Sequence, residues 1–133
     1  MIYVPSRIVD EAGVLVSFEM ILQDLVAQVP RAIGAILVDW EGEAVMECCH
    51  CDPYDIRFIA AHKGIILTRF KKMRSAEQVG AVEDVVVTSS EGHLIIGCID
   101  QDYSLVMKIE RSCPVALALH HFRRAIGALK REI

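Results

Sequence analysis

IGAILVDWEGEAVMECC, residues 33–49, holds the clearest structural signal in this chain. An apolar run is followed by the turn Asp39-Trp40-Glu41-Gly42 and then by a second, mostly apolar run. Gly42 tolerates the positive φ that tight hairpin loops require. We therefore predict a hairpin of two strands, over 32–38 and 43–49. The first strand is apolar on both faces, as is typical of a strand inside a sheet that is covered on both sides.

Helices are predicted on both sides of this hairpin. Residues 17–29 carry apolar side chains at helical spacing, Ser17 is placed to cap the first turn, and Pro30 ends the pattern. The pair Asp52-Pro53 is a typical helix start, and residues 54–73 follow it. That second helix is apolar over more than one stripe, so we expect it to pack on the sheet and still expose apolar surface.

Three strands and a last helix are predicted over the rest of the chain. Residues 82–88, 93–99 and 103–109 read as strands, and their short polar links indicate an antiparallel meander. The predicted turns are Ser90-Glu91-Gly92 and Asp100-Gln101-Asp102. Residues 113–132 have one apolar stripe and Pro114 near their start, which predicts a helix.

The resulting order is helix, two strands, helix, three strands, helix, and it resembles the roadblock family of dynein-light-chain-associated domains over residues 17–132. The resemblance implies an α/β fold with a central five-stranded antiparallel sheet, the middle helix on one face and the two end helices on the other. This layering is like that of profilin. We expect a roadblock-like domain over 17–133 and an N-terminal extension over 1–16. Pro5 and Gly13 argue against a long helix in that extension.

Composition narrows the class of protein. A chain of 133 residues with 53% hydrophobic and 24% charged residues fits one globular domain. Charges interrupt every apolar run before the roughly 18 residues that span a bilayer, and the first residues do not form a secretory signal. The net charge of −4 gives no general attraction to nucleic acid. The odd count of 5 cysteines favours reduced thiols, so we expect a cytoplasmic protein.

The cluster Cys48-Cys49-His50-Cys51 is the main candidate for metal chemistry. Thiolates and imidazole suit zinc, but neighbouring residues of a strand point to opposite faces, so Cys48 and Cys49 are poorly placed to share an ion. The usual paired spacing of two residues between cysteines is also missing. We therefore predict no bound metal and no cofactor. No P-loop, dinucleotide motif or nucleophile elbow occurs, and roadblock domains are not known as enzymes, so we predict no catalytic residues.

The charge pattern is more informative. Six of the 14 basic residues lie between 57 and 74, where no acidic residue occurs. Attraction to the C-terminal end of a helix explains the later ones but not Arg57. The alternatives are an acidic protein partner, an anionic membrane surface or nucleic acid. Paired middle helices commonly form the docking face of roadblock dimers, which favours the protein partner. The predicted partner-interface residues are Arg57, Lys63, Ile66, Arg69 and Phe70.

The last helix also has a basic side, which we interpret as a solvated face. Its cations are Arg123, Arg124, Lys130 and Arg131.

The strand over 82–88 lies at a sheet edge in this topology. Neither Lys nor Pro guards it, and an unguarded edge invites pairing with another chain. Symmetric pairing with a second copy would hide it and, as the resemblance implies, place the middle helices side by side. The predicted dimer-interface residues are Ile59, Val85, Val86, Val87 and Thr88.

Together these features predict a non-enzymatic homodimeric scaffold or regulator that binds a small Ras-like GTPase, as the resemblance to bacterial gliding and polarity regulators implies. Two alternatives stay open. One is a small-molecule or metal-binding sensor module, which would use the cysteine–histidine cluster. The other is a structural subunit of a motor-like complex. We expect neither nucleic-acid binding nor membrane insertion.

Overall fold

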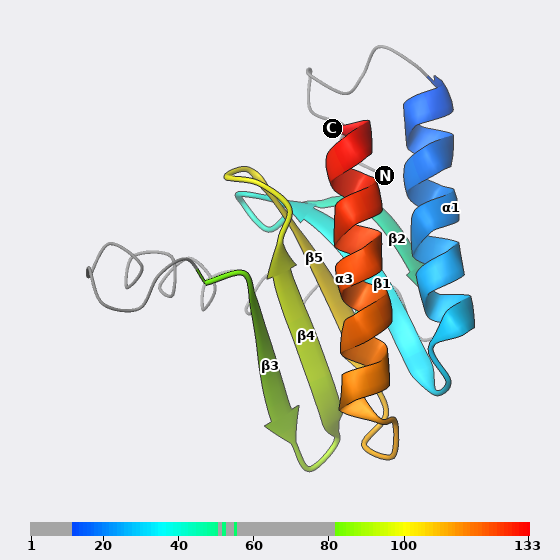
Figure 1. The fold of residues 1–133 in the computed structure, drawn as a ribbon, viewed down its shortest axis with the longest axis vertical. Coiled ribbons are helices and arrows are strands. Elements are labelled where there is room, and N and C mark those ends of the chain that lie inside the picture. The colour runs from blue at the N-terminus through cyan, green and yellow to red at the C-terminus, as the bar shows by residue number, and fades with distance from the viewer. Residues whose placement is uncertain (1–11, 51, 53–54, 56–81) are drawn as a thin grey trace.

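The computed structural model describes residues 12–50, 52, 55 and 82–133. Two helices and five strands follow one another along these residues, and Figure 1 shows their arrangement. In chain order they are α1 (Ala12–Gln28), β1 (Ala32–Asp39), β2 (Ala44–Cys49), β3 (Asp84–Ser89), β4 (Gly92–Cys98), β5 (Tyr103–Ile109) and α3 (Val115–Glu132).

The strands form one five-stranded sheet in the order β2-β1-β5-β4-β3, and every neighbouring pair is antiparallel. β1 lies inside the sheet, between β2 and β5, which confirms the prediction from its apolar faces. Ala35 and Leu37 point to one face, and Ile36 and Val38 point to the other. A bulge where Leu37 is followed by Val38 shifts the register of β1 with β2. The meander of β3, β4 and β5 is confirmed, and it leaves β3 at one edge.

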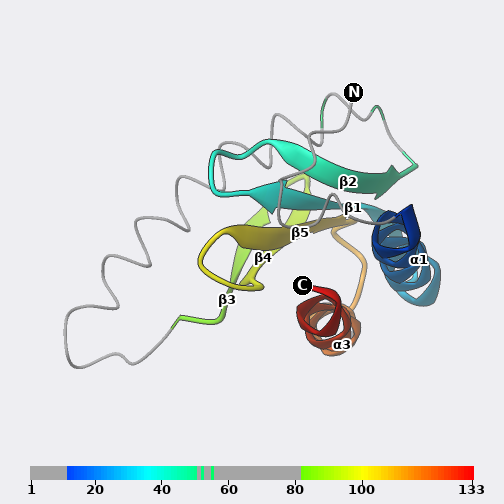
Figure 2. The ribbon, with the colours of Figure 1, turned by 90° about the horizontal axis from the view of Figure 1, so that it is seen from above.

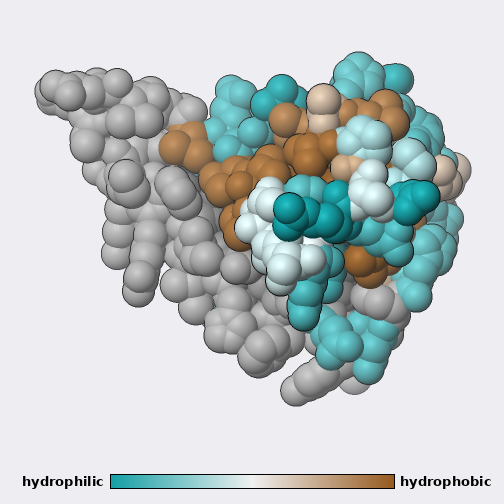
Figure 3. All heavy atoms as spheres, turned by 90° about the horizontal axis from the view of Figure 1, so that it is seen from below, coloured by the Kyte–Doolittle hydropathy of each residue, from teal (hydrophilic) through white to brown (hydrophobic). Residues whose placement is uncertain are grey.

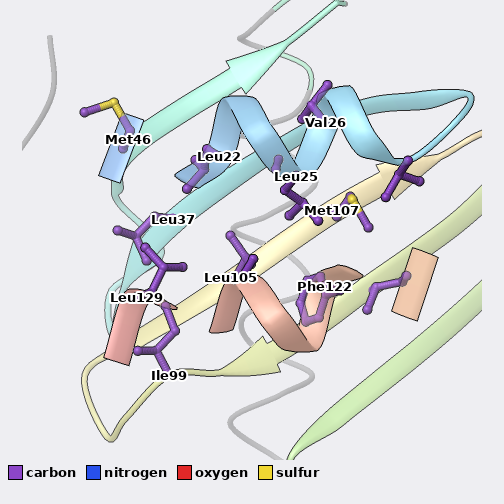
Figure 4. Packing of buried hydrophobic residues seen from close by; sticks show 14 of the residues in the cluster. Leu22, Leu25, Val26, Leu37, Met46, Ile99, Leu105, Met107, Phe122 and Leu129 are labelled. Atoms are coloured by element: carbon purple, nitrogen blue, oxygen red, sulfur yellow. The ribbon is translucent and has the colours of Figure 1, made fainter. Parts of the chain in front are cut away.

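Both described helices lie on the same face of the sheet, side by side (Figures 1 and 2). This agrees with the predicted placement of the two end helices on one face. Their apolar stripes meet the strands in a continuous core, seen from close by in Figure 4. Phe18 and Leu22 of α1, and Phe122 and Leu129 of α3, are fully buried there. Burying a side chain of this size contributes about 1.5–3 kcal/mol, so this core dominates the stability of the described fold.

A second, smaller apolar cluster occupies the opposite face of the sheet. Ile36, Val38, Ile96 and Val106 are its buried members. Val85 and Leu94 pack against them. We predicted that the helix over 54–73 covers this face. That helix lies outside the described residues, apart from Asp55, which is helical and donates its amide hydrogen to the Asp52 carbonyl at 3.1 Å. The contact agrees with the predicted helix start at Asp52-Pro53.

Two local predictions were wrong. α1 begins at Ala12, so Ser17 lies inside the helix and does not cap it. Gly13 stands near the first residue of α1, where few intrahelical hydrogen bonds depend on it, so it does not stop the helix. Residues 12–16 therefore continue the first helix of the domain. At the β3–β4 turn, Gly92 is the first residue of β4, which leaves Ser90 and Glu91 as the loop.

The β1–β2 turn confirms the hairpin and shows how it is fixed. The buried Asp39 carboxylate accepts hydrogen bonds from the backbone amides of Glu41 and Glu43, at 2.9 and 3.0 Å. Gly42 has a φ of 85°, which a residue with a side chain rarely adopts. The turn chemistry read from the sequence is therefore the chemistry that closes this hairpin.

Candidate functional site: the free edge of the sheet

β3 ends the sheet, and among the described strands only β4 pairs with it. Val85, Val86, Val87 and Thr88 all lie on it, so their predicted position at a sheet edge is confirmed. Ile59, the remaining predicted dimer-interface residue, lies outside the described residues. Val86 is among the exposed large hydrophobic residues, with 36% of its surface accessible. An apolar edge strand of this kind is a template for another strand.

The register identifies the backbone groups that face away from the sheet. In an antiparallel pair, alternate residues direct both their N–H and their C=O toward the neighbouring strand. The Cys98 N–H donates to the Glu83 carbonyl at 3.0 Å, and two residues later Val85 stands opposite Ile96. Glu83, Val85 and Val87 therefore direct their backbone groups toward β4. Asp84, Val86 and Thr88 direct theirs toward the free side.

The start of this edge is anchored to α3. The Arg123 guanidinium donates to both carboxylate oxygens of Asp84, at 2.9 and 3.3 Å. The contact joins residues that are 39 positions apart, and no local sequence pattern indicates it. The Arg123 side chain is 61% exposed, so its predicted place on a solvated face is confirmed. The structure adds a partner on β3 that the prediction did not include, because α3 brings its basic side close to that strand.

The far end of the edge is anchored by the buried His93. Its Nδ1 lies 2.8 Å from the Thr88 hydroxyl, and its Nε2 lies 3.2 Å from the Arg111 carbonyl oxygen. A carbonyl oxygen only accepts, so Nε2 carries a hydrogen and donates it to Arg111, and Nδ1 shares a hydrogen bond with the Thr88 hydroxyl. The Arg111 guanidinium also donates to the Ser89 carbonyl at 2.6 Å. These contacts hold β3 in place at both ends, and sequence reasoning assigned no role to His93 or Arg111.

The predicted partner-interface residues are not placed by the structure. Arg57, Lys63, Ile66, Arg69 and Phe70 all lie outside the described residues. Their assignment stays a prediction.

The cysteines are separated as the strand geometry predicted. Cys48 packs against the core under the helices, whereas Cys49 packs against the cluster on the opposite face. Burial, followed by the nearby Cys49 and Glu19, raises the pKa of the Cys48 thiol. That thiol stays protonated at neutral pH and is a poor nucleophile and a poor metal ligand. Within the described ranges, no group of three or more His, Cys, Asp or Glu side chains is arranged to hold a metal ion. Cys51 lies outside them.

The fold is one that solved proteins share. The gliding protein MglB from Thermus thermophilus superimposes with a TM-score of 0.83 and 16% identity, over 98% of this chain and 97% of that one. A roadblock/LC7 domain from Streptomyces avermitilis gives a TM-score of 0.76 and 18% identity, over 85% and 94%.

This chain has the roadblock/LC7 fold. The likeness confirms the fold that the order of elements implied. LokiProfilin2, solved in complex with rabbit actin, is similar to it with a TM-score of 0.57 and 15% identity, over 86% of this chain and 96% of that one. The profilin-like layering that we expected agrees with this similarity. No family model and no curated protein matches the sequence. In this roadblock fold, neither described helix is long and apolar enough to cross a membrane.

Proposed function

We propose that the protein is a non-enzymatic homodimeric scaffold that binds and regulates a small Ras-like GTPase in the cytoplasm. The free β3 edge supports this proposal best. It is apolar, it lacks Lys and Pro, and contacts at both ends hold it in place. Likeness to MglB over almost the whole of both chains adds support, because the resemblance to gliding and polarity regulators implies that role.

Dimerisation is the first part of the proposal. Two β3 strands, related by a twofold axis, would satisfy each other's outward backbone groups and join two five-stranded sheets into one. The Arg123 guanidinium neutralises Asp84, whose side chain is only 18% exposed. That pairing removes the repulsion that two Asp84 carboxylates would otherwise create at a symmetric interface. A charged side chain on an edge strand normally opposes pairing with another chain. Here the charge of Asp84 is already balanced by Arg123 of the same copy.

GTPase binding is the second part. The segment over 57–74 concentrates six cations in a protein whose net charge is −4. Such a field attracts an acidic surface and speeds its association. The resemblance implies that the middle helices of a roadblock dimer form the docking face. We therefore assign the partner surface to Arg57, Lys63, Ile66, Arg69 and Phe70, and the middle-helix contribution to the dimer to Ile59.

The test is a titration of Ras-like GTPases from the same genome, in both nucleotide states, against the wild-type protein and the double variant Lys63→Glu, Arg69→Glu. We expect the variant to associate more slowly and to show a weaker salt dependence, because single exposed ion pairs contribute only about 0.2–1 kcal/mol and two reversals add repulsion. The control is Lys130→Glu with Arg131→Glu, which changes the net charge equally on α3. Absence of binding to every GTPase, or equal binding by both double variants, would refute the assignment.

The absence of metal is part of the same proposal, since a metal sensor is the main alternative. Elemental analysis of purified protein should find no stoichiometric zinc. About one zinc per chain, lost in Cys49→Ser, would favour the sensor module instead.

A further inference from the structure

The outward side of α3 has a surface that the proposed GTPase scaffold does not use. α3 buries Ala118, Phe122, Ala125 and Leu129 toward the sheet. On the exposed side of the same helix, five residues border a shallow hollow of about 440 Å³ that is open to solvent. They are Ala116, Leu119, His120, Arg123 and Arg124.

The hollow has an apolar floor and a cationic rim. Ala116 adds only a methyl group to its wall, and Leu119 is half-buried against the core. Figure 3, which views the end of the molecule that carries the β3–β4 turn and the start of α3, shows hydrophobic residues gathered in a band beside hydrophilic ones. Leu117 of α3 and Val86 of β3 are both exposed large hydrophobic residues, at 40% and 36%. The lining of the hollow itself combines the apolar Ala116 and Leu119 with the cations Arg123 and Arg124.

The two guanidinium groups at the rim differ in their contacts. Arg123 is 61% exposed but is already paired with Asp84, at 2.9 Å. Arg124 is exposed and forms no ion pair with a described residue, and the exposed His120 makes only a ring contact, with His121. Around them α3 carries four cations, Arg123, Arg124, Lys130 and Arg131, against the single carboxylate of Glu132. The guanidinium of Arg124 could therefore bind a carboxylate of a partner protein, because the two N–H groups of its fork match the two oxygens of a carboxylate.

We propose that this hollow on α3 docks an acidic amphipathic segment of a partner protein. An apolar side chain of that segment would lie over Ala116 and Leu119, and a carboxylate next to it would bind Arg124. Charge complementarity selects this partner, since the helix is cationic in an acidic protein. Apart from its histidines, α3 has one aromatic residue, Phe122, which is fully buried. The helix therefore exposes no Phe, Tyr or Trp ring on which nucleic-acid bases could stack, which argues against a nucleic-acid partner.

None of the lining residues belongs to the segment over 57–74, so the inference does not depend on whether a GTPase binds that segment. With both surfaces occupied, the protein would be an adaptor that links a GTPase to a second, acidic protein.

The experiment uses the full-length ¹⁵N-labelled protein and a fluorescent helical peptide with Leu at every third or fourth position and Glu between. Binding should shift the backbone amides of residues 116–124. Arg124→Glu should weaken it by about tenfold, because it replaces an attractive pair with a repulsive one. Ala116→Gln should also weaken it, because it fills the hollow with a polar side chain that the helix tolerates. The matched control, Arg131→Glu, changes the net charge equally on the same helix but outside the lining, and should have a much smaller effect.

Several results would overturn the proposal. One is equal loss in Arg131→Glu and Arg124→Glu, which would show attraction to net charge alone. Others are shifts confined to residues outside 116–124, and equal binding of a peptide with Lys in place of Glu. Binding to phosphatidylserine-containing vesicles but not to the peptide would assign the surface to a membrane. Failure of the peptide to bind at all would also refute it. Unchanged amide spectra of the free variants would establish that each is folded.

Discussion

At the scale of single residues, Gly97 marks the closest approach of α3 to the sheet. A methyl group added there would lie 2.6 Å from Cε2 of Phe122 and 3.2 Å from Cδ1 of Ile126. Phe122 is fully buried in the core and has no room to move away. The absence of a side chain at position 97 therefore sets the distance between β4 and α3.

Gly97→Ala should lower the free energy of unfolding by about 1–3 kcal/mol, the usual cost of overpacking. The control is Gly127→Ala on α3, where the nearest atom, Nη1 of Arg131, would lie 3.8 Å away. That substitution should stabilise the protein by up to about 1 kcal/mol, because Ala favours the helix more than Gly does. Urea denaturation measures both. Equal stability of Gly97→Ala and wild type would contradict the close packing described here.

At the scale of elements, β3 is an edge strand whose two sets of backbone groups have different partners. Those of Val85 and Val87 belong to the pairing with β4, and those of Val86 face the free side. A proline removes one N–H donor, so its effect depends on which set that donor belongs to. Substitutions at neighbouring positions of one strand thus separate folding from assembly.

Val86→Pro should yield a folded monomer, because the donor it removes faces a second copy and not β4. Val87→Pro removes the donor directed at Leu94 and should lower the free energy of unfolding by about 1–3 kcal/mol, the cost of an unsatisfied buried group. Light scattering on a size-exclusion column gives the mass, and circular dichroism on heating gives the stability. A Val86→Pro protein that still dimerises would exclude pairing through this edge.

At the scale of the whole molecule, α1 and α3 cover one face of the sheet, and β3 has a neighbour on one side only among the described strands. The prediction that follows concerns mass. Wild-type protein at micromolar concentration should have twice the chain mass of 14.8 kDa. Pairing of the β3 edges of two copies would satisfy the backbone N–H and C=O groups that each edge otherwise exposes to solvent. A mass near 14.8 kDa at every concentration would refute the homodimer.

The sequence by itself determined the order of the described elements, two helices and five strands. Apolar periodicity is local, so the spacing in 17–29 and 113–132 located α1 and α3, and Asp39 with Gly42 located the hairpin turn. The exact ends of the helices depend on more than this spacing. α1 starts at Ala12 because neighbouring turns can extend a helix past a glycine and past a good capping residue such as Ser17.

Only the tertiary structure decided how β3 is held. The Arg123–Asp84 pair joins positions 39 apart, and His93 reaches Arg111 across 18. The spacing of apolar residues in the sequence does not predict such contacts, because they depend on where α3 and the β5–α3 connection lie over the sheet. The same placement gives the solvated basic face of α3 one guanidinium that is paired with β3, Arg123, and one that forms no ion pair with a described residue, Arg124. Local sequence patterns specify which face of an element is apolar, and packing alone specifies which distant polar groups meet.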